Sequence, residues 1–106
     1  MADKIHKLVI TTGSAQILKH ILHLGEWYKG RSVALGLAAI SVLEDLSSVQ
    51  VAEDATEEQL QVTVTVEMTE TEREACKICV KHFYDAGAFT LTKHIACLLM
   101  TLGLDG

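Results

Sequence analysis

The segment Leu60–Met68 constrains the fold of this chain most, because apolar and polar residues alternate along it without a break. Side chains of a β-strand point alternately to opposite faces, so this pattern predicts a strand with one buried face. Valine and threonine, both favourable in strands, dominate the segment. The residues expected to face the core are Leu60, Val62, Val64, Val66 and Met68, and those expected to face outward are Gln61, Thr63, Thr65 and Glu67.

The hydrophobic period changes to that of a helix directly after this strand. Thr69 or Thr71 can cap the N-terminus of this helix, and the glutamates that follow favour its positive end. Its apolar stripe continues to Phe83, and Asp85–Gly87 is expected to end it. A second apolar stripe of helical spacing then runs to a stop at Gly103.

The first half of the chain shows the same order of predicted elements. Lys4–Thr11 is interpreted as a strand, Ser14 as the N-cap of a helix that closes at Lys29–Gly30, and Arg31–Leu46 as a second, apolar helix. The two halves align at an offset of about 56 residues, although few residues are identical. The pattern therefore predicts a repeated strand-helix-helix unit.

The repeat predicts one shared core. We divide the chain into a first unit at residues 1–46, an acidic linker at 47–59 and a second unit at 60–106. Val49 and Val51 could add a short strand in the linker. Because a unit of about 45 residues is marginal as an independent fold, we expect the two strands to pair as an antiparallel ribbon covered by all four helices. The expected fold class is mainly α with a two-stranded antiparallel β-ribbon.

Charge is distributed unevenly along the 106 residues. The net charge of −5 argues against indiscriminate coating of nucleic acid. Residues 1–33 carry a balance of +3, whereas residues 50–74 carry −7. A ligand attracted by cations should therefore meet the N-terminal half first.

Cysteine content and hydropathy indicate a cytoplasmic location. Three cysteines, an odd count, do not suit a secreted disulfide framework. No apolar run approaches the roughly 18 residues that a membrane span requires, and Met1–Lys4 does not open a signal-peptide pattern. We therefore expect neither a leader nor a membrane partner.

Two segments resemble the ribbon-helix-helix DNA-binding family of the Arc and MetJ type. Lys29–Val33 resembles the Gly-Arg-Ser turn that opens the family's second helix. Val64–Glu72, followed by Asp85–Gly87 and Leu91–Ile95, looks like a second copy. Family members build the ribbon from two chains, so the resemblance implies a tandem (β-α-α)2 pseudo-dimer within one chain.

The resemblance implies a sequence-specific DNA-binding regulator or DNA-processing accessory protein that reads the major groove of double-stranded DNA with its ribbon. The implied base-reading residues are Lys7, Val9, Thr11, Gln61, Thr63 and Thr65. The implied phosphate contacts are Gly30, Arg31, Ser32 and Val33 in one half, and Ala88, Phe89 and Thr90 in the other. Pseudo-dimers could also associate on adjacent sites.

Three features depart from the family pattern, one of which is that the second turn has no arginine or lysine beside Gly87. Val9 occupies a position where a polar reader is expected, and Glu67 on the outward face would repel phosphate. The alternative is a protein-interaction module, such as an antitoxin or inhibitor, that uses its acidic surface on a protein partner.

Other groups of residues in the sequence give weaker indications of a metal or catalytic site. Four residues superficially resemble a zinc-finger ligand set: Cys76, Cys79, His94 and Cys97. Their spacing is unusual, and the helical period favours the first two as small buried hydrophobes, so the zinc site remains only an alternative. His20 and His23 have a metal-binding spacing but no third ligand. No nucleophile elbow or phosphate loop is present, so we expect neither an enzyme nor a cofactor.

Overall fold

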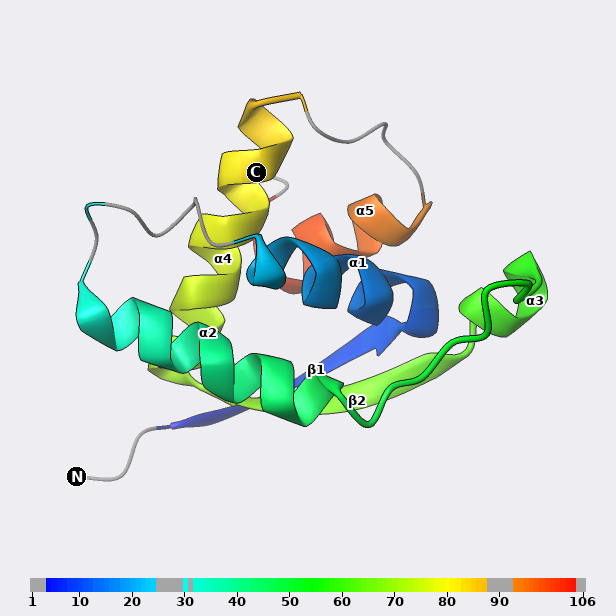
Figure 1. Cartoon of the computed structure of the whole chain (residues 1–106), viewed down its shortest axis with the longest axis horizontal. Helices are drawn as coiled ribbons and strands as arrows, with labels where there is room; N and C mark the ends of the chain where they lie inside the picture. The colour runs from blue at the N-terminus through cyan, green and yellow to red at the C-terminus, as the bar shows by residue number, and fades with distance from the viewer. Residues whose placement is uncertain (1–3, 25–29, 31, 88–92, 105–106) are drawn as a thin grey trace.

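The computed structural model describes residues 4–24, 30, 32–87 and 93–104 of the chain. Its architecture is mainly helical with a two-stranded antiparallel sheet, as the sequence predicts. In chain order the elements are β1 (Ile5–Thr11), α1 (Thr12–His23), α2 (Val33–Leu46), α3 (Glu57–Leu60), β2 (Thr63–Thr69), α4 (Glu70–Asp85) and α5 (Lys93–Thr101) (Figure 1). None of these helices is long and apolar enough to cross a membrane.

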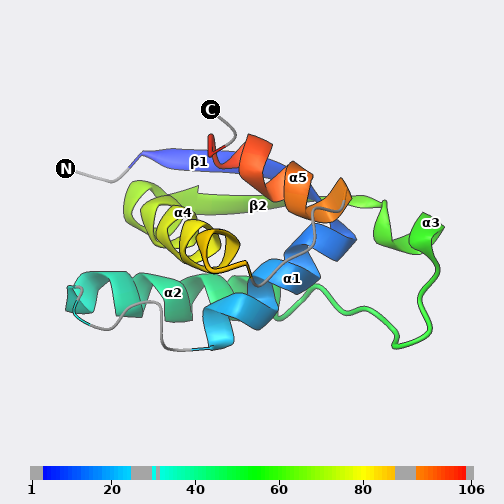
Figure 2. The same cartoon turned by 90° about the horizontal axis from the view of Figure 1, so that it is seen from above.

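The two strands pair along their whole length. Their register runs from Ile5 opposite Thr69 to Thr11 opposite Thr63, and both strands show the same succession of exposed and buried positions. The side chains buried beneath the helices are Leu8, Ile10, Val66 and Met68. α1, α2, α4 and α5 gather over this inner face of the sheet, whereas α3 lies beyond its end (Figures 1 and 2).

The predicted start of the second strand is wrong by three residues. Thr56 and Gln59 form a capping box, in which each side chain accepts a hydrogen bond from the other residue's backbone N–H, and α3 occupies Glu57–Leu60. Leu60 is consequently half-buried in a helical turn, and Val62 is 59% exposed instead of facing the core. In the described linker, Val49 and Val51 form no strand.

Each strand runs into its helix without a loop. Thr69 caps α4 through a capping box with Glu72, which confirms one of the two predicted caps. The first helix begins earlier than predicted, because Thr11, and not Ser14, is its N-cap. The Thr11 hydroxyl accepts a hydrogen bond from the Ser14 backbone nitrogen at 3.0 Å. Ser14 lies inside the helix and donates its hydroxyl to the carbonyl oxygen of His94 at 2.7 Å.

The helix ends fall close to the predicted glycines in the second half but not in the first. α4 ends at Asp85 and is followed by Gly87, whose φ of 74° lies in the left-handed region that glycine adopts without steric cost. α1, by contrast, ends at His23, well before the predicted Lys29–Gly30.

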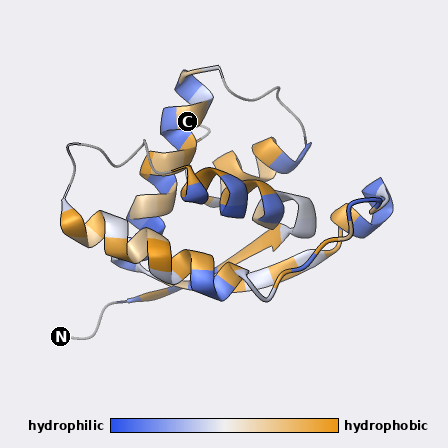
Figure 3. Cartoon of the chain, in the orientation of Figure 1, coloured by the Kyte–Doolittle hydropathy of each residue, from blue (hydrophilic) through white to orange (hydrophobic). Residues whose placement is uncertain are grey.

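Helices from the two halves of the chain pack crosswise in the core. α1 packs against α5, α2 packs against α4, and α1 and α4 contact each other, while α1 also contacts α2 within the first half. Cys76 and Cys79 are buried in this core, which confirms that they act as small hydrophobes. Hydrophobic residues continue onto the solvent side of α2, where Val33, Leu37 and Ile40 are exposed (Figure 3).

Candidate nucleic-acid interface

The outer face of the strand pair is the face that the helices leave open (Figure 1). Lys7, Thr63 and Thr65 are exposed on it, and Val9 is 57% exposed. The alternation of side chains explains this placement, because the intervening positions of both strands are committed to the core. Four of the six expected base-reading residues therefore lie on one exposed face.

Pairs of these residues lie directly opposite each other across the sheet. Val9 faces Thr65, and Lys7 faces Glu67. No hydrogen bond within the described residues engages the hydroxyl of Thr63 or Thr65. The centre of the face thus offers two hydroxyl groups, one ammonium group and one carboxylate to a partner.

The outward orientation expected for Thr11 is wrong. Its hydroxyl is engaged on the helical side, 2.7 Å from the Ser14 hydroxyl and 2.8 Å from Nδ1 of His94, and the residue is half-buried. The last residue of β1 is used to start α1, and its side chain follows the helix instead of the strand. Thr11 therefore joins elements of the fold and is not available to a ligand.

Gln61 also departs from its expected role. It lies at the C-terminal end of α3, before β2 begins, and is exposed there. Its side-chain nitrogen donates to Oε1 of Glu57 at 3.5 Å, one helical turn earlier. Gln61 is therefore not part of the strand face.

Acidic and basic groups nearly balance on this side of the sheet. Lys7 lies opposite Glu67, and Lys4 is exposed just before β1. At the same end of the sheet, Nε2 of His6 contacts Oε2 of Glu70 in the first turn of α4. The hydrogen bond from His6 lowers the pKa of the exposed Glu70 carboxyl below its ordinary value.

Of the residues expected to contact phosphate, the structure describes those at the start of α2. Gly30 has a φ of 77°, and Ser32 is the N-cap of α2, with no hydrogen bond from its hydroxyl to the helix. Val33 is 78% exposed. The first amides of a helix lack intrahelical partners, so this end can receive an anion. Arg31, Ala88, Phe89 and Thr90 lie outside the described residues.

A polar network around His94 was not anticipated from the sequence. Nδ1 of His94 bonds to Thr11, and Nε2 lies 3.1 Å from Oε1 of Glu57 in α3. That second contact has the distance of an ion pair but does not satisfy hydrogen-bond geometry. The network joins β1, α3 and α5, which are far apart in the chain.

The described residues do not support the zinc alternative. They contain no group of three or more histidine, cysteine, aspartate or glutamate side chains placed to hold a metal ion. Cys76 and Cys79 are buried in the core, and burial raises the pKa of Cys76 to about 12 and also raises that of Cys79. His20 and His23 share a shallow groove on α1 with Gln16 and Lys19.

Comparisons of the chain with models of known protein families, with curated proteins and with solved structures found no match.

Proposed function

We propose that this protein is a sequence-specific DNA-binding protein that inserts the β1–β2 ribbon into the major groove, as a transcriptional regulator or a DNA-processing accessory protein. The observation that carries the proposal is the uncovered outer face, with Lys7, Thr63 and Thr65 exposed on a two-stranded ribbon. A two-stranded ribbon has a width that the major groove admits.

We further propose that the fold is a tandem ribbon-helix-helix pseudo-dimer. The order strand-helix-helix occurs twice, and the two strands share one burial pattern at an offset of 58 residues, since Leu8 corresponds to Val66, Ile10 to Met68 and Thr11 to Thr69. The expected offset of about 56 fits the second helices, where Val42 and Leu98 are both buried.

The crosswise packing of the helices supports the same reading of the fold. α1 of the first half packs on α5 of the second, and α4 of the second packs on α2 of the first. Each strand contacts helices of the other half as well as of its own, so the two halves share one core.

The exposed side chains have suitable chemistry for reading base edges. Lys7 can donate to the acceptors of guanine, and the hydroxyls of Thr63 and Thr65 can donate or accept. The amides at the start of α2, with Ser32, would contact phosphate oxygens and fix the register of the ribbon on the duplex. Arg31 would add a charge-assisted phosphate contact, and Ala88, Phe89 and Thr90 would serve the second half.

Selection from a library of genomic fragments, followed by affinity measurements over a series of salt concentrations, tests this proposal. The affinity for a selected site should fall steeply with salt, because each neutralised phosphate releases counterions. Lys7→Ala should cost about 1–3 kcal/mol at the selected site if Lys7 reads a base. Lys81→Ala is the matched control, because Lys81 is exposed beside Asp85 near the C-terminal end of α4, away from the ribbon.

Two results would contradict the proposal. One is the absence of any selected fragment at low salt, and the other is an equal loss of affinity for Lys7→Ala and Lys81→Ala. Thr65→Val offers an independent check, since it keeps a strand-favouring residue but removes the hydroxyl from the outer face.

The pseudo-dimer has its own test, which requires no ligand. Because one chain supplies both strands, the free energy of unfolding should not depend on protein concentration. A dependence on concentration would indicate that the folded unit needs a second chain.

A protein-interaction module is the second candidate function. The observation that favours it is Glu67 opposite Lys7 on the outer face, with Ile5 and Val9 also exposed there. A nearly neutral, partly apolar face suits a protein partner as well as a base edge. Binding that is insensitive to salt and persists in a nuclease-treated extract would favour this candidate.

A further inference from the structure

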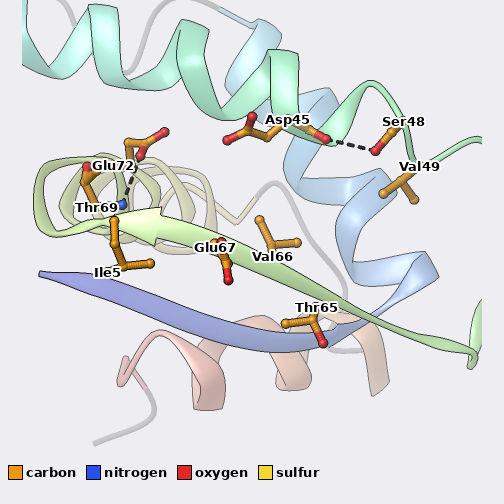
Figure 4. A pocket seen from close by; sticks show the side chains of 9 residues that line it. All are labelled: Ile5, Asp45, Ser48, Val49, Thr65, Val66, Glu67, Thr69 and Glu72. Carbon is orange, nitrogen blue, oxygen red and sulfur yellow. Dashed lines mark hydrogen bonds between the residues drawn. The ribbon is translucent and has the colours of Figure 1, made fainter.

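The two edges of the β1–β2 sheet are covered unequally. α5 packs along β1, whereas the neighbours of β2 are α4, which begins where the strand ends, and α2, which packs on it less closely (Figure 2). Between the C-terminal end of α2 and β2 lies a groove of about 580 Å³, a size typical of ligand-binding sites. Asp45 lines it from α2, Thr65 and Glu67 from β2, and Glu72 from α4 (Figure 4).

The register of the sheet determines which backbone groups of β2 face this groove. The Thr12 nitrogen donates to the Val62 oxygen at 2.7 Å, so residues 64, 66 and 68 bond to β1 and the alternate residues point to the free edge. Thr69 confirms this direction, because its N–H, which points away from β1, donates to Oε1 of Glu72 at 2.9 Å.

Two residues of this edge retain unpaired backbone groups. The N–H and C=O of Thr65 and of Glu67 have no hydrogen-bond partner among the described residues. An edge of this kind can pair with another extended chain. At about 3.4 Å per residue, the stretch Thr65–Thr69 matches a partner segment of about five residues.

The groove is acidic. Its charged lining residues are Asp45, Glu67 and Glu72, and no lining residue is basic. Oε2 of Glu72 is shielded from solvent and has no hydrogen-bond partner among the described residues, although Oε1 is occupied by Thr69. A shielded carboxylate oxygen without a partner is costly, and a cationic group in the groove would lower that cost through its charge, without direct contact with the shielded oxygen.

We propose that the groove binds an extended, basic segment of a partner polypeptide as a third strand along β2. Main-chain hydrogen bonds to Thr65 and Glu67 would hold the segment, and lysine or arginine side chains would pair with Asp45 and Glu72. A second copy of this chain fits less well, because pairing two β2 edges would bring two acidic grooves together. Val49 and Val66 line the groove as well and would contact the apolar parts of the segment.

A short synthetic peptide tests this proposal on the full chain without DNA, so its outcome is independent of DNA binding. The probe is acetyl-Thr-Arg-Thr-Arg-Thr-amide, and binding is followed by the NMR shifts of the protein's backbone amides. The amides of Thr65 and Glu67 should shift and become protected from hydrogen exchange as the probe is added. The charge-reversed probe, with glutamate in place of arginine, should not bind.

The side-chain contacts are tested with the double variant Asp45→Asn, Glu72→Gln. Glutamine at position 72 keeps the capping box with Thr69 while removing the charge. We expect the double variant to bind the probe about ten-fold more weakly. Glu53→Gln combined with Asp54→Asn, at two exposed sites in the linker, is the matched control for the loss of two charges and should bind as the unaltered chain does.

The main-chain contacts are tested on the unaltered protein with a probe methylated at every backbone nitrogen. It keeps both positive charges but cannot donate to β2, so it should lose binding. The proposal is overturned if the original probe does not bind at about 1 mM, or if the methylated or charge-reversed probe binds equally well. It is also overturned if the double variant binds normally, or if self-association of the protein without probe shifts the amides of Thr65 and Glu67.

Discussion

The imidazole ring of His94 lies so close to the backbone of Gly13 that a β-carbon at Gly13 would come within 2.7 Å of three ring atoms. The ring cannot easily move away, because Nδ1 bonds to Thr11 at 2.8 Å. The contact between His94 and Gly13 brings α5 onto the first turn of α1. It is possible because Gly13 has no side chain.

Gly13→Ala should therefore destabilise the protein. Alanine ordinarily stabilises a helix relative to glycine, but here the added methyl group must displace the ring, at a net cost of about 1–3 kcal/mol. Gly36→Ala in α2 is the matched control, because a β-carbon there meets nothing within 4 Å and should stabilise by about 0.5–1 kcal/mol. Urea unfolding of both variants checks this, and stabilisation of both would contradict it.

The two capping boxes should differ in their effect on stability. Thr69→Ala removes the cap of the 16-residue α4, which is packed in the core, and should cost about 1–2 kcal/mol. Thr56→Ala removes the cap of the four-residue α3, which has no buried residue, and should cost less than about 0.5 kcal/mol. Thermal unfolding measures both. Equal losses would mean that α3 is as closely coupled to the core as α4.

Stability should fall in acid partly through Glu70. Its pKa is lower in the folded chain than in the unfolded chain because His6 donates a hydrogen bond to it. The carboxylate therefore contributes stability above its ordinary pKa and loses that contribution as the pH falls through the lowered value. Between about pH 7 and about pH 3, the unaltered chain should lose more stability than Glu70→Gln, which does not titrate.

The measurement for Glu70 is the urea midpoint of both proteins at each pH. Glu53→Gln, exposed in the linker, serves as the control for a change in net charge. A constant difference between the unaltered chain and Glu70→Gln at every pH would show that the contact with His6 does not depend on the charge of Glu70.

Thiol labelling should distinguish the three cysteines. Burial raises the pKa of Cys76 to about 12 and also raises that of Cys79, so at about pH 8 almost none of either is the reactive thiolate. Cys97 is only half-buried. We expect a thiol reagent to modify Cys97 first and the other two at the rate of unfolding, as followed by mass spectrometry of the digested protein. Early modification of Cys79 would contradict the described core.

The sequence allowed the strands to be predicted because their signal is local. Alternation along Val64–Met68 and along β1 is a property of neighbouring residues, and the structure confirms both strands and their antiparallel pairing. The errors lie at the boundaries. Both Thr11 and Ser14 are good N-cap residues, and nothing local indicates that the strand continues directly into the helix.

Only those residues of the candidate site whose orientation follows from strand alternation could be predicted from the sequence. Lys7, Val9, Thr63 and Thr65 are exposed as expected, because alternation decides their orientation. The Thr11–His94 contact joins residues 83 positions apart, so no local pattern reveals it. The groove beside β2 depends on how far α2 stands from the sheet, which is set by packing in the whole core.

One polypeptide supplies both strands, so residues that face each other across the sheet can differ in identity. In a ribbon made by two identical chains, symmetry would repeat every substitution on both sides at once. Here Lys7 meets Glu67, and Val9 meets Thr65. A single mutation changes only one of the two strands, so the two strands of this surface can evolve separately. A ligand bound to this surface therefore does not need two-fold symmetry.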